Sequence, residues 1–412
     1  MSEILRKYMK GDATLWTVFF VLCIISTVEM YSASSTLAYK ASSYAAPVLR
    51  HVFFLGFGVI IAFVAHLIPY KYIRMLSYAG LALSVFMLIF VLFKGKSAND
   101  ATRWLEIGGI QFQPSELAKL SLIGVVADLI ARIKASPEKE PRLFWSMLGI
   151  AGVISFLILL ENFSTAGILF GVVFIMMFIG RISGKKLLFL VVVLVSAVVL
   201  GLTAFKVIPK ETMPDFLERG YTWVARIDRF ADEETYEEKY SITDDNLQEQ
   251  HGKIAIARGG FFGLMPGNSV QRDFLPQAYS DFIYAIIVEE LGMFGGIFLI
   301  VMFMILLYRA GRIATMSRTV FPAILVMGLT LMIVIQAFVS MAVSTGLGPV
   351  TGQPMPLISR GGTSILITSI YFGIIFGVTR QIKEERLQTA SDSPAPAIPV
   401  IEEEEEEEVE EL

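Results

Sequence analysis

The chain has 412 residues and a formal net charge of −4, with 55% hydrophobic residues and only 17% charged residues. A soluble domain carries about 25% charged residues, so this composition excludes a soluble globular protein and favours a polytopic membrane protein. Cys23 is the only cysteine, which excludes an intrachain disulfide and a cysteine metal site.

Ten apolar segments predict an all-α polytopic fold, because a helix needs about 20 apolar residues to cross a bilayer. The segments cover residues 14–33, 52–68, 73–93, 116–133, 143–160, 164–180, 187–206, 281–307, 320–343 and 362–379. For residues 143–180, one broken helix and two helices are the alternatives, and we favour two helices joined by a tight turn. The first segment is longer than a signal-peptide core of about 7–15 residues, so we interpret it as an uncleaved anchor.

Positive charges predict the orientation of these spans, because cytoplasmic connections carry an excess of Lys and Arg. Clusters of Lys and Arg precede the first span, follow the last span and occupy every second connection between them. With ten spans, all of these clusters fall on one side, so we expect both termini to be cytoplasmic. We expect residues 1–12 to form the N-terminal segment, 13–380 the membrane domain and 381–412 a disordered acidic tail.

Three connections on the opposite side, the first, second and third outer loops, are rich in Gly, Pro and polar residues. They cover residues 94–115, 208–280 and 346–361. Such backbone lies at membrane depth only where it lines an enclosed or watery cavity. Within the large second loop, residues 216–262 show a partly helical, amphipathic pattern. A helix on the outer membrane surface and a solvated loop helix are both compatible with that pattern.

Several ionisable residues lie at the outer edge of the predicted spans. Asp281 begins the eighth span, and Ser280 or Asp281 is also a good N-cap for its helix. Glu289 and Glu290 follow about two turns deeper, and we interpret them as structural or coupling groups. Glu116 at the start of the fourth span suits the helix dipole. Lys119 does not suit the dipole, and it can pair with Glu116 or with an anionic ligand.

Cations and glycines in the second and third outer loops predict an anion site, with turns packed only for shape as the alternative. A glycine-rich start of a helix, such as Gly361-Gly362, favours anions. At the outer face no ATP is available, so a lipid-linked pyrophosphate would bring its own energy. A carboxylate base then takes a proton from the acceptor hydroxyl, and cations stabilise the leaving diphosphate. A transporter would place its charges nearer the midplane, so this pattern favours an enzyme.

A set of short motifs, spread in order along the membrane part, resembles the SEDS family, the polytopic group that includes FtsW, RodA and SpoVE. Each motif is weak alone, but together, in this order on ten spans, the motifs are highly specific. They are YSAS at 31–34, RW at 103–104, QPSELAK at 113–119, AIA at 255–257, GG at 259–260, LP at 275–276, DFI at 281–283, EELG at 289–292, PVTG at 349–352 and GG at 361–362.

The resemblance implies a peptidoglycan glycosyltransferase that polymerises lipid II at the outer face of the bacterial inner membrane. The expected partners are lipid II, a class B penicillin-binding protein transpeptidase and other divisome proteins, and no nucleic acid is expected. The YSAS motif favours the cell-division branch of the family, and hence a septal location. A lipid II flippase, an elongation-type polymerase and a non-catalytic scaffold are the alternatives.

The resemblance also assigns roles to individual residues. Asp281 is the expected essential carboxylate. The expected substrate-binding residues are Arg103, Trp104, Glu116, Lys119, Arg258, Arg272, Asp273, Ser359, Arg360, Gly361 and Gly362. A divalent cation, Mg²⁺ or Mn²⁺, beside the leaving pyrophosphate is the one cofactor considered, and no metal ligands are assigned.

The chain departs from the family pattern around Asp281. Gln277, Tyr279 and Ser280 stand where the pattern has Glu, His and Thr. Because Gln277 cannot act as a base, a mechanism with two carboxylates needs Asp273 in that role. Arg360 replaces an aromatic residue, and we expect it to help hold pyrophosphate or to pair with an acid.

Overall fold

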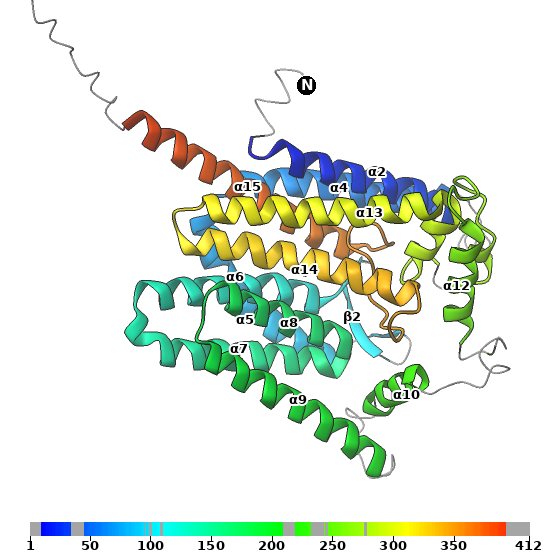
Figure 1. The fold of residues 1–412 in the computed structure, drawn as a ribbon, viewed down its shortest axis with the longest axis horizontal. Helices are drawn as coiled ribbons and strands as arrows, with labels where there is room; N and C mark the ends of the chain where they lie inside the picture. The colour runs from blue at the N-terminus through cyan, green and yellow to red at the C-terminus, as the bar shows by residue number, and fades with distance from the viewer. Residues whose placement is uncertain are drawn as a thin grey trace, which may run out of the picture.

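The computed structural model describes residues 10–33, 45–94, 96–98, 101–107, 110–208, 219–231, 243, 246–275 and 278–392. In this part of the chain, long helices lie side by side as a bundle (Figure 1). We call one end of the bundle, at the right of Figure 1, the loop end. It carries β2 (Ala101–Ile107), α10 (Arg219–Ala231) and α12 (Leu247–Gly259). The predicted all-α polytopic fold is confirmed.

Ten long helices of the described residues each overlap one predicted span. They are α2 (Ala13–Ala33), α4 (Ala45–Leu67), α5 (Tyr70–Lys94), α6 (Pro114–Ala135), α7 (Glu140–Glu161), α8 (Phe163–Ile179), α9 (Gly184–Val207), α13 (Ile283–Met316), α14 (Val320–Ser344) and α15 (Thr363–Asp392). Eight of them are long and apolar enough to cross a membrane. Of the other two, α8 is apolar but has 17 residues, and α6 carries Glu116, Lys119 and Asp128 among its buried residues.

The break between α7 and α8 is a single residue, Asn162, so the prediction of two helices is confirmed. Asn162 has extended backbone, and its Oδ1 accepts a hydrogen bond from the backbone N–H of Thr165 at 3.2 Å. This bond satisfies a backbone donor in the first turn of α8, which is the usual role of Asn at a helix N-cap. The turn therefore ends one helix and begins the next with no loop between them.

α14 lies at the centre of the bundle, against α6, α8, α13 and α15. In its most apolar stretch 78% of the residues are buried, compared with 11% in α9. α9 is tied to its neighbours near its two ends, by an ion pair of Lys186 with Glu140 and another of Lys206 with Asp228. Because α9 is apolar and largely uncovered by protein, its surface suits a lipid environment.

The first outer loop contains a small antiparallel sheet that the all-helical prediction did not include. β1 (Lys96–Ala98) pairs with β2, and β2 pairs with β3 (Ile110–Phe112). Leu105 lies opposite Phe112, and such apolar cross-strand pairs stabilise a sheet. β2 also lies against α5, α6 and α7, which supplies the tertiary packing that short strands need.

The second outer loop is partly helical, as predicted, because α10 and α12 lie in it. α10 packs on the protein itself: the ring of Trp223 lies 5.1 Å from the ring of Phe163 at the start of α8. α15 continues as a helix to Asp392, beyond the predicted domain boundary at residue 380. The rest of the predicted disordered tail lies outside the described residues.

Candidate active site

Asp281 lies in a turn at the loop end, immediately before α13. The predicted capping role of Ser280 or Asp281 is wrong, because the turn extends one residue further and Phe282 occupies the N-cap position. Instead, the Ser280 hydroxyl donates to Asp281 Oδ1 at 2.9 Å. Asp281 is half-buried, whereas Phe282 and Ile283 beside it are almost fully buried. Its carboxylate therefore lies at the edge of the protein core.

The third outer loop is hydrogen-bonded to this turn. Ser359 Oγ donates to the backbone oxygen of Ser280 at 2.6 Å. The backbone N–H of Arg360 donates to the backbone oxygen of Tyr279 at 2.8 Å. Three of the predicted site residues, Asp281, Ser359 and Arg360, are thus brought together although they come from two distant parts of the sequence.

The backbone of the third outer loop lies close to Asp281 at Gly352. A Cβ atom on Gly352 would lie 3.6 Å from Asp281 Oδ2, and Gly352 has a left-handed φ of 65°. Gly361 and Gly362 directly precede α15, which begins at Thr363. The positive end of the α15 dipole therefore lies three residues after Arg360 in the chain, which favours negative charge at this place.

Lys119 and Glu116 form a buried ion pair beneath the third outer loop. Lys119 Nζ lies 2.7 Å from Glu116 Oε1, and the two side chains are 1% and 9% exposed. Lys119 Nζ also donates to Gln336 Oε1 on α14 at 3.3 Å, and Gln336 Nε2 donates to the backbone oxygen of Pro354 at 3.0 Å. The pair therefore connects α6 and α14 to the loop. Contact of Lys119 or Glu116 with a substrate stays a prediction.

The remaining predicted site residues are more dispersed. Trp104 is half-buried on β2, and the side chain of Arg103 lies outside the described residues. Arg258 is exposed in the last turn of α12. Arg272 donates to the backbone oxygens of Ser32 and Gly267, at 3.1 and 2.8 Å, so its guanidinium braces the second outer loop. Asp273 beside it is exposed.

Glu289 and Glu290 are fully buried and hold the second outer loop against α13. Glu290 accepts hydrogen bonds from the backbone N–H groups of Gly267 and Ser269, at 3.0 and 3.1 Å. Glu289 accepts from the backbone N–H of Val270 at 3.1 Å and from the Ser269 hydroxyl. These donors belong to the loop, and the Ser32 hydroxyl of α2 also donates to Glu290. The contacts agree with the interpretation of both carboxylates as structural groups.

Gly263 is a point of close contact between the second outer loop and the backbone of α13. Its φ is +77°, and a Cβ atom there would lie 2.2 Å from the backbone oxygen of Glu290. A left-handed backbone alone costs an L-residue about 1–2 kcal/mol. We expect Gly263→Ala to lower the free energy of unfolding by more than that amount, because the clash adds to it. The thermal midpoint of the purified protein measures the effect.

Gly267→Ala is the control for this prediction. Gly267 also has a positive φ, +89°, but its Cβ would meet open space. Both variants place an L-residue at a positive φ, and only Gly263→Ala adds a clash with α13. Equal thermal midpoints for Gly263→Ala and Gly267→Ala would show that the close contact with α13 does not stabilise the protein.

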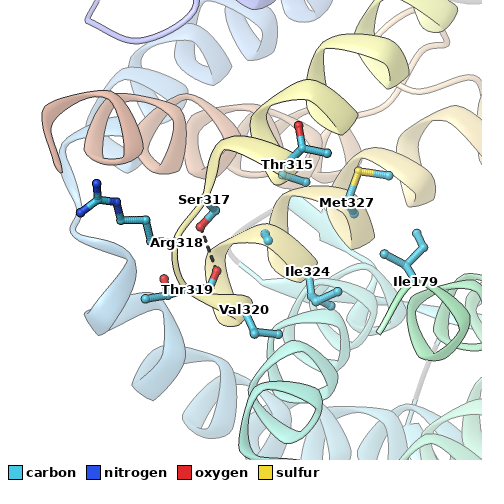
Figure 2. A pocket seen from close by; sticks show the side chains of 10 residues that line it. Ile179, Thr315, Ser317, Arg318, Thr319, Val320, Ile324 and Met327 are labelled. Carbon is cyan, nitrogen blue, oxygen red and sulfur yellow. Dashed lines mark hydrogen bonds between the residues drawn. The ribbon is translucent and has the colours of Figure 1, made fainter. Parts of the chain in front are cut away.

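A surface pocket of about 270 Å³ lies at the opposite end of the bundle. Its lining includes Thr315 in the last turn of α13, the connecting residues Ser317, Arg318 and Thr319, and Ile179 at the end of α8 (Figure 2). α13 starts just after Asp281 and is kinked at Gly292. The part of α13 after the kink alone spans roughly 35 Å at 1.5 Å per residue, and it lies between Asp281 and the pocket. The pocket is therefore not part of the candidate site.

Residues 12–384 match the cell cycle protein family of FtsW, RodA and SpoVE. The chain belongs to this family. A probable peptidoglycan glycosyltransferase FtsW from Alcanivorax borkumensis is 32% identical over 388 residues, which cover 90% of this chain and 94% of the relative. Stage V sporulation protein E from Bacillus subtilis is 30% identical over 380 residues, which cover 91% and 98%.

Solved structures share the fold of this FtsW/RodA/SpoVE-family protein. A chain from a peptidoglycan synthase complex that coordinates polymerization and crosslinking superposes with a TM-score of 0.68, at 22% identity, over 90% of this chain and 98% of that chain. The rod shape determining protein RodA from Thermus thermophilus superposes with a TM-score of 0.61, at 21% identity, over 90% and 97%.

Two departures of this FtsW/RodA/SpoVE-family protein from the family pattern contact each other. The guanidinium of Arg360 lies 5.1 Å from the ring centroid of Tyr279. A cation over an aromatic ring is favourable, so Tyr279 in place of His and Arg360 in place of an aromatic residue form a matched pair. The structure thus shows Arg360 in contact with the ring of Tyr279. A contact of Arg360 with pyrophosphate or with an acid stays a prediction.

Sequence reasoning missed two polar residues of α14 that support the site. Ser344 Oγ lies 3.2 Å from the backbone oxygen of Asp281 and 3.0 Å from that of Ser340, and Gln336 links Lys119 to the third outer loop. The signal for both was a polar side chain within an apolar span, which needs a partner inside the protein. That signal identifies a buried polar contact, but it does not identify the partner.

Proposed function

We propose that this chain is a peptidoglycan glycosyltransferase that polymerises lipid II into glycan strands. Membership of the FtsW/RodA/SpoVE family and relatives named as probable peptidoglycan glycosyltransferases support the proposal. The observation that carries it is the setting of Asp281. A half-buried carboxylate lies in a turn at the loop end, and the third outer loop brings Arg360 to that same turn.

In the proposed reaction, a hydroxyl of the acceptor sugar attacks the anomeric carbon of the donor lipid II. Asp281 takes the proton of that hydroxyl as the new glycosidic bond forms. The bond between the donor sugar and its pyrophosphate breaks, and the lipid pyrophosphate leaves with the electron pair. Asp281 then passes the proton to water, which returns the carboxylate to its starting state.

Cations at the loop end stabilise the negative charge that develops on the leaving diphosphate. We assign this role to Arg360. Its backbone N–H is hydrogen-bonded to the backbone oxygen of Tyr279, two residues before Asp281, so Arg360 lies next to the turn that carries Asp281. The start of α15 adds its dipole at the same place. Arg103 and Trp104, on β2 of the first outer loop, are proposed to complete the substrate site.

A divalent cation at this site stays a proposal. Among the described residues, no three His, Cys, Asp or Glu side chains gather in a way that could hold a metal ion on their own. Mg²⁺, however, usually keeps several waters and is bound by one or two carboxylates together with substrate phosphates. A single carboxylate such as Asp281, together with the donor pyrophosphate, would therefore be enough to hold it, and the ion would add to the stabilisation of the leaving diphosphate.

We further propose that the chain works with a class B penicillin-binding protein and other divisome proteins at the septum of the inner membrane. Similarity to relatives named FtsW supports the division role. The structural likeness to a chain of a peptidoglycan synthase complex supports a transpeptidase partner. The Lys and Arg clusters support two cytoplasmic termini.

The purified chain, reconstituted in proteoliposomes with the transpeptidase and supplied with lipid II, tests the proposal. We expect glycan strands to form, and a correctly folded complex that forms none would overturn the proposal. A flippase would instead translocate lipid II independently of Asp281. A non-catalytic scaffold would support division in cells that carry only the Asp281→Asn variant.

A further inference from the structure

Ser26 on α2 and His51 on α4 form a buried polar pair within apolar helices. Ser26 is 0% exposed and His51 is 3% exposed, and Ser26 Oγ lies 2.8 Å from His51 Nε2. A polar group buried in a membrane-spanning helix costs free energy unless it finds a hydrogen-bond partner. Neither residue belongs to the site described above, so the pair needs its own explanation.

The hydroxyl of Ser26 reaches the third outer loop. Ser26 Oγ lies 2.7 Å from the backbone oxygen of Leu357 and 3.2 Å from that of Ile358. A hydroxyl has one proton to donate, and carbonyl oxygens only accept, so the Ser26 proton goes to the loop. His51 Nε2 must then carry the proton of the bond between His51 and Ser26. The two hydrogen bonds therefore run in one direction. His51 Nε2–H donates to Ser26 Oγ, and the Ser26 hydroxyl donates to the backbone oxygen of Leu357.

Leu357 is a residue whose conformation requires such support. Its φ is +64°, in the left-handed region, which costs an L-residue free energy that the surroundings must supply. Leu357 is also buried, at 2% exposure, so water does not replace a missing donor at its carbonyl. The Ser26 hydroxyl therefore stabilises the loop at a strained residue.

The backbone held by Ser26 leads directly to Asp281. Two residues after Leu357, Ser359 donates to the backbone oxygen of Ser280, and the next residue, Arg360, donates to that of Tyr279. Ser280 in turn donates to the Asp281 carboxylate. A shift of the loop at Leu357 is therefore transmitted over a short covalent distance to the turn that carries Asp281.

We propose that Ser26, oriented by His51, is a positioning residue for Asp281 and acts through loop residues 355–360. The proposal rests on the proposed function, because polymerisation is the activity that positioning would affect. Ser26 contacts the loop and not the reacting atoms. Without its hydroxyl, the loop relaxes, and Asp281 is no longer held at the distance that proton transfer from the acceptor requires.

Ser26→Ala removes the hydroxyl, and Thr27→Val is the matched control. The neighbouring Thr27 Oγ1 also donates to a backbone oxygen, but within α2, to Cys23 at 3.0 Å. Because a misplacement of about 1 Å costs up to about 100-fold in rate, we expect Ser26→Ala to lower kcat for lipid II polymerisation about 10- to 100-fold. We expect its KM to stay near the wild-type value, and Thr27→Val to change neither constant.

Amide hydrogen exchange supplies a second readout that does not depend on activity. The amides of Ser359 and Arg360 donate to the backbone oxygens of Met355 and Tyr279, so their exchange reports how firmly the loop is held. We expect faster exchange at both amides in Ser26→Ala than in Thr27→Val. Unchanged exchange, or an unchanged kcat, in Ser26→Ala would overturn the proposal.

His51→Phe provides a second variant in case Ser26→Ala does not fold. This variant keeps an aromatic ring but removes the Nε2 donor. We expect it to lower kcat and to speed amide exchange at Ser359 and Arg360, in both cases by less than Ser26→Ala does. Wild-type rates and exchange in His51→Phe would contradict the role of His51. A wild-type protein without polymerase activity would instead refute the proposed function, while the exchange data would still decide whether Ser26 holds the loop.

Discussion

Asp281→Asn is expected to abolish lipid II polymerisation, because a positioned general base contributes about 10²- to 10⁴-fold to a rate. Asn has nearly the size of Asp, and its amide oxygen can accept the hydrogen bond that Ser280 donates. The turn before α13 should therefore keep its structure. What is lost is the ability to take the proton of the acceptor hydroxyl. The initial rate of glycan synthesis by the reconstituted complex measures this loss.

Asp228→Asn is the matched control, because it makes the same chemical change in the second outer loop. Asp228 lies on α10 and pairs with Lys206 at 2.6 Å, and both side chains are exposed. An exposed ion pair contributes only about 0–1 kcal/mol, so we expect this variant to polymerise at the wild-type rate. A folded Asp281→Asn protein that is as active as Asp228→Asn would remove Asp281 from the chemistry.

Lys119→Met is expected to lower the free energy of unfolding by about 3–5 kcal/mol, the usual cost of breaking a buried ion pair. The variant leaves the carboxylate of Glu116 buried without its cation, and it removes the contact with Gln336. The third outer loop then loses part of its support, because Gln336 also donates to Pro354. Thermal or chemical denaturation of the detergent-solubilised protein measures the change.

The double variant Glu116→Gln with Lys119→Met separates the two explanations of Lys119. Replacing both members of a buried ion pair costs much less than removing one, so we expect the double variant to recover most of the stability. Recovery would show that the pair is needed as a pair. A Lys119→Met protein that is as stable as wild type but inactive would instead favour a direct contact of Lys119 with an anionic substrate.

The positions of the helices could be predicted because membrane-spanning helices are set by local apolar composition. Even the single-residue break at Asn162 has a local signal, since Asn is a common N-cap. The sheet of the first outer loop could not be predicted in this way. Its strands are too short to show an alternation of apolar and polar residues. Their stability comes from pairing with each other and from packing on α5, α6 and α7.

The candidate site was only partly predictable, because it too depends on contacts between segments that are distant in the sequence. Motifs identified Asp281, Ser359 and Arg360, and the structure brings them together. The capping assignment failed because the turn includes Phe282, and nothing in the sequence fixes the length of that turn. The bond from Ser26 to Leu357 spans 331 residues and ends on a backbone oxygen, so no side-chain pattern at residue 357 reveals it.

The most direct test of Asp281 as the base is the rate of a single round of glycosidic bond formation with lipid II bound to saturation. Wild type and Asp281→Asn are compared at equal lipid II occupancy, so that neither binding nor folding enters the comparison. The expected result is equal occupancy with a rate lowered at least about 100-fold in Asp281→Asn. Equal rates at equal occupancy would contradict the assignment of Asp281 as the base.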